Sequence, residues 1–155
     1  MKILFFTLPL LTFLIPSSIS NTILQSTGKV RFSEIKTFAD KWNELYHSNV
    51  KLFEATRLGS GSVQVSVDDL EYIKTMRWSI GFDIGTNRKF KNSTAGKISY
   101  KILNQESLMW LQKELSTIDS YPVKDYFITK DNFAQKITLM YTNKSRHLEI
   151  MIKLN

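Results

Sequence analysis

The sequence contains no cysteine among its 155 residues. Disulfide-stapled toxins, growth factors and knottins are therefore excluded, as are cysteine nucleophiles and thiolate metal sites. A domain of this size without disulfides must hold its fold by core packing alone. We also find no internal repeat, no low-complexity run and no sign of a second domain.

The sequence also lacks a recognisable catalytic or cofactor-binding motif. It has no Gly-x-Ser-x-Gly nucleophile elbow, and the stretch from Gly85 to Gly96 matches neither Gly-x-x-x-x-Gly-Lys nor Gly-x-Gly-x-x-Gly. We therefore expect no catalytic residue, no cofactor and no metal ligand. A non-enzymatic function is favoured, and a small hydrolase built from scattered polar residues is the alternative.

No apolar run is long enough to span a membrane. Residues 3–15 are mostly apolar, but a spanning helix needs about 20 such residues. Lys2 precedes this run, and Ser18-Ile19-Ser20 follows it with the small residues of a cleavage site before Asn21. We expect residues 1–20 to be a secretory signal peptide, with an uncleaved anchor as the alternative.

Removal of the signal peptide would leave residues 21–155 as a single basic domain that is secreted. The full chain has 21 Lys and Arg against 14 Asp and Glu, and only Lys2 lies in the leader, so the mature chain has 20 against 14. This balance favours anionic partners such as glycans, phospholipid head groups or nucleic acid. A small apolar ligand is the other partner class that we consider.

Arg88, Lys89 and Lys91 are the candidate anion-binding residues. They surround Phe90 in a segment that we expect to be a loop between two strands, where the ring could stack on a ligand. An ordinary solvated charged loop is the alternative.

Two N-glycosylation sequons lie in the mature chain, at Asn92-Ser93-Thr94 and Asn143-Lys144-Ser145. Both fall between strand-like runs, where a glycan could lie on the surface. Asn92 and Asn143 are therefore the glycosylation candidates.

Helices are expected mainly in the first half of the mature chain. Apolar residues at helical spacing after Ser33 predict an amphipathic helix over 34–47. The sequence Ser66-Val67-Asp68-Asp69 resembles a capping box and predicts a short helix over 68–76. A third helix is predicted over 106–117, with a strand over 107–111 as the alternative.

Alternating apolar residues predict strands, most of them later in the chain. They include a C-terminal hairpin with a turn at 143–145; the predicted strands are 63–67, 77–84, 97–103, 123–129, 137–141 and 148–154. The fold class is therefore α+β, with N-terminal amphipathic helices packed on an antiparallel sheet that ends in the hairpin.

Three segments together resemble a known family. They are Phe38 to Tyr46 in the first predicted helix, Ser66 to Ile73 in the second, and the C-terminal hairpin. Their order resembles that of small secreted nuclear transport factor 2-like (cystatin-superfold) domains, although the predicted helix at 106–117 departs from that pattern. Members of this fold include enzymes, binding cups and scaffold modules, so the resemblance implies a fold and no single function.

Few titratable residues are spaced for chemistry. Asp40, Glu44 and His47 have metal-ligand spacing, but on a helix they would face water, and no second such helix exists. His47 or His147 could act as a base only if folding brought Asp40, Asp68, Asp69 or Glu149 beside it. Asp68 and Asp69 are better explained by a helix N-terminus.

Aromatic residues are frequent in the second half of the chain. They could line an apolar pocket or, as alternating aromatics in strands usually do, fill the core. These residues are Trp78, Phe82, Tyr100, Trp110, Tyr121, Tyr126 and Phe127.

Overall fold

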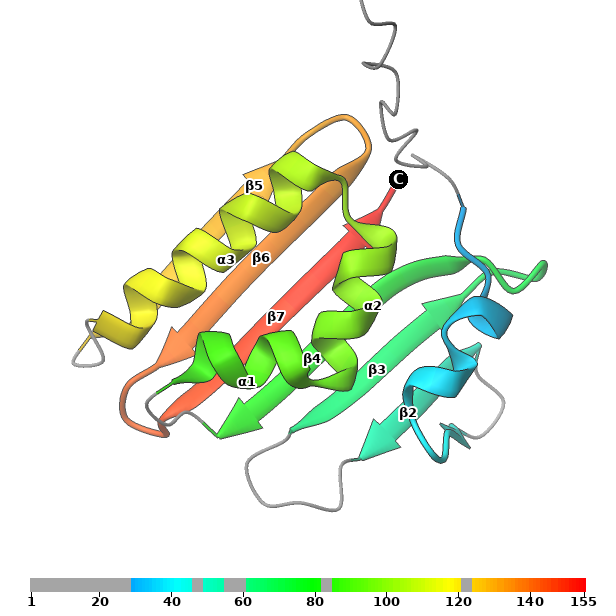
Figure 1. The fold of residues 1–155 in the computed structure, drawn as a ribbon, viewed down its shortest axis with the longest axis horizontal. Helices are drawn as coiled ribbons and strands as arrows, with labels where there is room; N and C mark the ends of the chain where they lie inside the picture. The colour runs from blue at the N-terminus through cyan, green and yellow to red at the C-terminus, as the bar shows by residue number, and fades with distance from the viewer. Residues whose placement is uncertain (1–28, 46–48, 55–60, 82–84, 121–123) are drawn as a thin grey trace, which may run out of the picture.

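A computed structural model of the chain describes residues 29–45, 49–54, 61–81, 85–120 and 124–155 (Figure 1). The predicted signal peptide lies outside the described residues. Among those that are described, no helix is long and apolar enough to cross a membrane.

The strands of the described residues form one antiparallel sheet with the spatial order β1-β2-β3-β4-β7-β6-β5. The strands β4 and β7 lie at its centre, and β1 and β5 are the two edges. Their bounds are β1 Asn43–Glu44, β2 Val50–Glu54, β3 Ser62–Val67, β4 Ile73–Gly81, β5 Tyr126–Asp131, β6 Gln135–Thr142 and β7 His147–Leu154.

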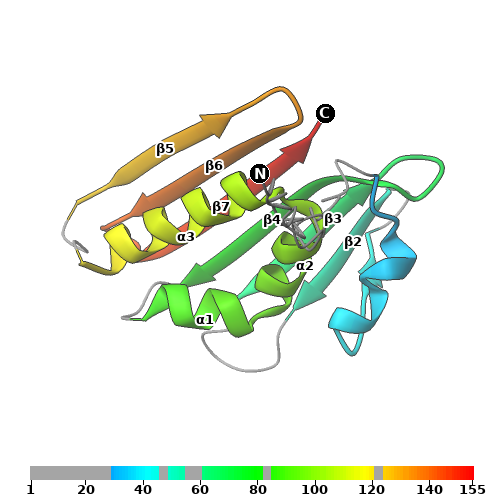
Figure 2. The same cartoon turned by 45° about the horizontal axis from the view of Figure 1, so that its top comes forward.

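The helices lie between β4 and β5 in the sequence and all cover the same face of the sheet (Figures 1 and 2). Helix α3 runs along β5 and β6, and α1 and α2 lie over the centre of the sheet. Their bounds are α1 Thr86–Asn92, α2 Thr94–Ile102 and α3 Gln105–Ser120. The opposite face, which we call the open face, carries no helix of the described residues.

The core lies between the helices and the sheet. Alternation along each strand puts the apolar side chains there: Val63, Val65 and Val67 are buried, whereas Ser62 and Gln64 point to the open face and are only half-buried. The buried rings of Trp78 on β4 and Phe90 on α1 pack against each other in this core, with centroids 5.3 Å apart. The α+β class with an antiparallel sheet is therefore confirmed.

The predicted helix over 34–47 is wrong over residues 34–45, and residues 46 and 47 lie outside the described residues. The segment forms two 3-10 turns, Phe32–Glu34 and Lys36–Phe38, followed by the short edge strand β1. Ile35 is fully buried, and Trp42 packs edge-on against Phe32 with ring centroids 5.3 Å apart. The apolar residues are thus buried from an irregular segment, because packing against the sheet outweighs helix propensity.

The predicted helix over 68–76 is also wrong. Asp68 begins the tight turn between β3 and β4, where its carboxylate accepts the backbone N–H groups of Leu70 at 3.1 Å and Tyr72 at 2.9 Å. Glu71 takes a left-handed conformation with φ 62°. An aspartate that caps its own backbone serves a turn as well as a helix, so the capping-box pattern was ambiguous.

The strand predicted over 97–103 is a helix, α2. Ser93 caps its N-terminus by accepting the backbone N–H of Gly96 at 3.0 Å. Ile98 and Ile102 are buried one turn apart, while Tyr100 between them is 48% exposed. The apparent alternation was a helical i, i+4 pair.

The remaining elements agree better with the sequence. The helix over 106–117 is confirmed as α3, and its strand alternative is wrong. The strand over 63–67 and the C-terminal hairpin are confirmed, with Tyr141 opposite Leu148. Strand β4 begins earlier than predicted, at Ile73, and β5 begins at Tyr126; residues 82–84 of the first predicted strand and residue 123 of the second lie outside the described residues. Among the described residues, all three α-helices lie between β4 and β5, and neither amphipathic helix expected in the N-terminal half is formed.

Candidate functional site

Four polar side chains meet on the open face of the central strands β4 and β7. The Oγ of Ser79 and the Nε2 of His147 share a hydrogen bond of 2.9 Å. Beside them, the guanidinium of Arg77 donates to the carboxylate of Glu149 at 2.6 Å. The antiparallel register brings them together, because Ser79 lies directly opposite Glu149.

Glu149 is only 6% exposed, so its charge requires a partner. Arg77 supplies that partner from the neighbouring strand and covers the carboxylate, while remaining about half exposed itself. Removal of Arg77 alone would leave this buried carboxylate without a compensating charge, which is costly.

The contact between Ser79 and His147 is one that a serine nucleophile and its base require. Within the described residues, however, no carboxylate contacts His147, and Glu149 is already engaged by Arg77. Ser79 also lies inside a central strand whose backbone groups pair with β3 and β7, so no free N–H groups gather there as an oxyanion hole. The arrangement fits a cross-strand polar pair better than a catalytic dyad.

An apolar patch lies on the open face of β5, β6 and β7. Phe127 is 71% exposed, and Met140, directly opposite it on β6, is 39% exposed. Met151 on β7 is 43% exposed and lies opposite Thr138. We call these three residues the open-face patch.

The candidate anion-binding residues lie on helix α1 rather than on a loop, which corrects the prediction. Arg88 and Lys91 are exposed one turn apart, and Lys89 is half-buried. Phe90 is fully buried against Trp78, so its ring cannot stack on a ligand. What remains is a pair of exposed cations.

Both sequon asparagines are exposed. Asn92 is the last residue of α1, and its side-chain amide donates to the carbonyl of Arg88 at 3.2 Å. Asn143 lies in the turn between β6 and β7, where its backbone N–H donates to the carboxylate of Asp125 at 2.7 Å. A glycan on either side chain would extend into solvent.

The metal-ligand spacing of the sequence is not realised on a helix. Asp40 is exposed in a bend, Glu44 pairs with Lys51 across β1 and β2, and His47 lies outside the described residues. Asp69 is exposed and accepts a long hydrogen bond of 3.5 Å from Asn49. Over the described residues, no three potential ligands cluster.

The aromatic residues of the second half do not share one pocket. Trp78 is fully buried in the core, Tyr100 is exposed on α2, and Trp110 packs at the margin of the core. Phe82 and Tyr121 lie outside the described residues. Phe127 belongs to the open-face patch. The prediction that these aromatic residues fill the core is therefore correct for Trp78 and wrong for Phe127.

Tyr126 on β5 donates a hydrogen bond to Glu114 on α3, a carboxylate that is 8% exposed. Burial of the phenol, together with the nearby Glu114 carboxylate, raises the pKa of Tyr126 to about 12. This pair ties α3 to the edge strand.

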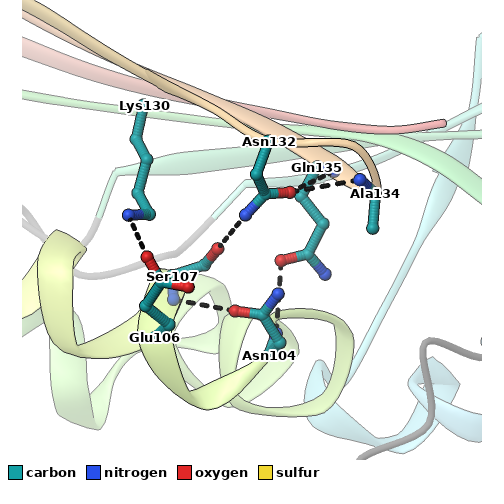
Figure 3. Close-up of polar contacts among 7 residues, drawn as sticks. All are labelled: Asn104, Glu106, Ser107, Lys130, Asn132, Ala134 and Gln135. Carbon is teal, nitrogen blue, oxygen red and sulfur yellow. Dashed lines mark hydrogen bonds and ion pairs between the residues drawn. The ribbon is translucent and has the colours of Figure 1, made fainter.

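A polar network fixes the start of α3 on the β5–β6 hairpin (Figure 3). The side chain of Asn104 accepts the backbone N–H of Ser107 at 2.8 Å, which caps the helix. Asn132 donates to the Ser107 hydroxyl at 3.2 Å, and buried Gln135 donates to the carbonyl of Ile102 at 2.7 Å. The members are all paired with one another, so this network is structural.

A small cavity adjoins this network. Its volume is about 60 Å³, which holds a few water molecules rather than an organic ligand. It is lined by Lys29, Tyr72, Ile73, Lys74, Ile102, Ala134, Gln135, Leu154 and Asn155.

No family model, curated protein or solved structure matches this chain. These comparisons therefore do not bear on the resemblance to nuclear transport factor 2-like domains.

Sequence reasoning missed Ser79 and Arg77. Their alternation with buried Met76, Trp78 and Ile80 places them on the face of β4 opposite the core. That signal is present in the sequence. The sequence does not show which strand pairs with β4, because β7 follows some 65 residues later in the chain.

Proposed function

We propose that this chain is an exported, non-enzymatic module that binds a partner protein through the open face of its sheet. The open-face patch of Phe127, Met140 and Met151 is the observation that supports this function. Adjoining apolar side chains left exposed on a surface mark interaction sites, and methionine adapts its shape to a partner. The pattern of residues 1–20 supports export.

A partner protein suits the open-face patch better than an organic ligand suits the cavity beside Gln135. Pockets for organic ligands measure about 300–1,000 Å³. The cavity beside Gln135 has about 60 Å³, and it lies at the other side of the sheet from the open-face patch. An exposed sheet face offers a broad surface to a partner protein.

Site-specific photocrosslinking tests the proposal. A photoreactive benzoylphenylalanine at position 127 should give an adduct of defined mass, different from twice the mass of this chain, in the fluid into which the protein is secreted. The same group at Lys97, exposed on helix α2, is the matched control and should not. The adduct should disappear in a Met140→Ser, Met151→Ser background. Equal adducts from both positions, or none, would contradict the proposal.

A small hydrolase is the second candidate, favoured by the contact between Ser79 and His147. We expect no turnover of ester, peptide, glycoside or phosphodiester substrates by the purified protein. Turnover that is lost in both Ser79→Ala and His147→Ala, with the folded structure retained by circular dichroism, would overturn the non-enzymatic function.

A further inference from the structure

Strand β5 is an edge of the sheet, and its outward backbone groups can be assigned. Asn132 and Gln135 exchange both backbone hydrogen bonds at the hairpin turn, at 2.9 and 3.3 Å. Hydrogen-bonded and non-hydrogen-bonded pairs alternate along an antiparallel ladder. The observed register carries this alternation back from Asn132 along β5. The backbone N–H and C=O groups of Tyr126, Ile128 and Lys130 therefore hydrogen-bond to β6.

The N–H and C=O groups of Phe127, Thr129 and Asp131 consequently point away from β6, toward the free edge. No described residue pairs with these groups. Their side chains all lie exposed on the open face. β5 thus offers three consecutive sites at which another strand could pair (Figures 1 and 2).

The edge has few of the devices that usually block strand pairing. β5 contains no proline, and its register with β6 is unbroken. Its two charges are neutralised within the chain: Lys130 contacts Glu106 at 2.6 Å, and Asp131 contacts Lys136 at 3.6 Å. A second strand would therefore approach a nearly neutral edge.

We propose that two copies of this chain pair through their β5 strands, antiparallel and about a twofold axis at Thr129. In this register Thr129 faces Thr129 of the second copy, Phe127 faces Asp131, and Ile128 faces Lys130. All three outward residues of each copy are then hydrogen-bonded. The two sheets become continuous, with both sets of helices on one side.

The strand's own sequence selects this register and favours a second copy as the partner. A twofold centred on Ile128 would place Asp125 opposite Asp131, and one centred on Lys130 would place two lysines face to face. Like charges directly opposite are destabilising. The register centred on Thr129 places no like charges opposite each other, and it pairs every outward N–H and C=O group of the strand. A twofold interface needs this self-complementarity.

The dimer brings the open-face patches of both copies onto one continuous surface. The axis is perpendicular to the sheet, so Phe127 of each copy lies on the same side. The inference goes beyond the proposed function and does not depend on it, because self-association is measurable without any other partner.

Sedimentation velocity of the purified protein over a range of concentrations tests the dimer. We expect a reversible monomer–dimer equilibrium for the wild type and for the control Thr129→Ala, which keeps the N–H. Thr129→Pro removes an outward N–H rather than one that bonds to β6, so its association should weaken at least about tenfold. Circular dichroism verifies that each variant is folded.

A charge pair tests the register even where Thr129→Pro does not fold. Thr129→Lys and Thr129→Glu should each be monomeric, because each places like charges face to face on the axis. An equimolar mixture of the two should recover the dimer. A monomeric wild type at about 100 µM, a mass that keeps growing beyond the dimer, or a mixture that stays monomeric would overturn the proposal.

Discussion

At the scale of single residues, the hydrogen bond between Tyr126 and Glu114 makes the stability of the fold depend on pH, because the pKa of Tyr126 is raised in the folded state. Burial and the nearby carboxylate raise the pKa of Tyr126 to about 12 from an ordinary value of 10.0. A raised pKa means that the folded state favours the protonated phenol. The stabilisation is therefore complete below pH 10 and is lost as the pH rises through about 12.

We predict that one of the six tyrosines titrates near pH 12 when absorbance at 295 nm is followed. This step should be missing in Tyr126→Phe. Because that variant leaves the buried Glu114 without its hydrogen-bond donor, it should also lower the free energy of unfolding by about 1–3 kcal/mol at pH 7. Tyr100→Phe, at an exposed phenol, is the control. An unchanged titration curve in Tyr126→Phe would contradict the assignment.

Glu149 is the second residue whose burial has consequences. Arg77→Met should destabilise the fold by about 1–3 kcal/mol in urea unfolding, since it leaves a carboxylate that is 6% exposed without its cation. The double variant Arg77→Met, Glu149→Leu removes both charges and should recover most of the loss. Equal destabilisation of the single and double variants would show that the pairing does not compensate the buried charge.

At the scale of elements, the corner between α1 and α2 depends on Gly96. A Cβ at this position would lie 2.0 Å from the backbone oxygen of Phe90, a contact that only a backbone shift can relieve. Helix propensity alone would make Gly96→Ala stabilising by up to about 1 kcal/mol. We predict the opposite sign, a loss of about 1–3 kcal/mol in thermal or urea unfolding.

The matched control for this corner is Gly81→Ala. No atom lies within 4 Å of a Cβ built there, so its stability should change by no more than about 0.5 kcal/mol. If Gly96→Ala were as stable as Gly81→Ala, the close approach of α2 to the end of α1 would be wrong.

Helix α1 also presents Arg88 and Lys91 one turn apart. If these cations bound an anionic glycan, Arg88→Ala with Lys91→Ala would elute from heparin at lower salt than the wild type. The control Lys97→Ala with Lys113→Ala also removes two exposed cations, one from α2 and one from α3. With only two exposed cations and no stacking ring, we predict that the paired substitution changes heparin elution no more than the control does. A selective loss would favour an anion-binding function.

Helices and strands were predictable from the sequence where a long local pattern was compatible with only one type of secondary structure. Helix α3 and the β6–β7 hairpin were predicted because leucines at helical spacing and two regular alternations leave few alternatives. Short or mixed patterns failed: Ile98, Tyr100 and Ile102 fit both a strand and a helix, and Asp68 fits both a cap and a turn. The candidate site was harder, because Ser79 meets His147 only once β7 has paired with β4.

At the scale of the whole molecule, the described residues place helices on one face of the sheet and leave the other face and the β5 edge without a covering element. An open sheet face and a free edge favour association, so export would expose both to many potential partners. Covalent sugar is one means of limiting such contacts. One sequon lies at the end of α1, and the other lies in the β6–β7 turn, where the backbone N–H of Asn143 donates to Asp125, the residue before β5.

We predict that secretion from a eukaryotic host removes residues 1–20 and adds a glycan at each of Asn92 and Asn143. N-terminal sequencing should begin at Asn21, and deglycosylation by an N-glycosidase should increase the gel mobility. Asn92→Gln and Asn143→Gln should each remove one step of that shift, because both asparagines are exposed and neither sequon contains proline. Retention of residues 1–20 would identify an anchor instead of a signal peptide. A protein that is released but unmodified would show that the sequons are not used, and the open face and β5 would then be the surfaces most exposed to partners.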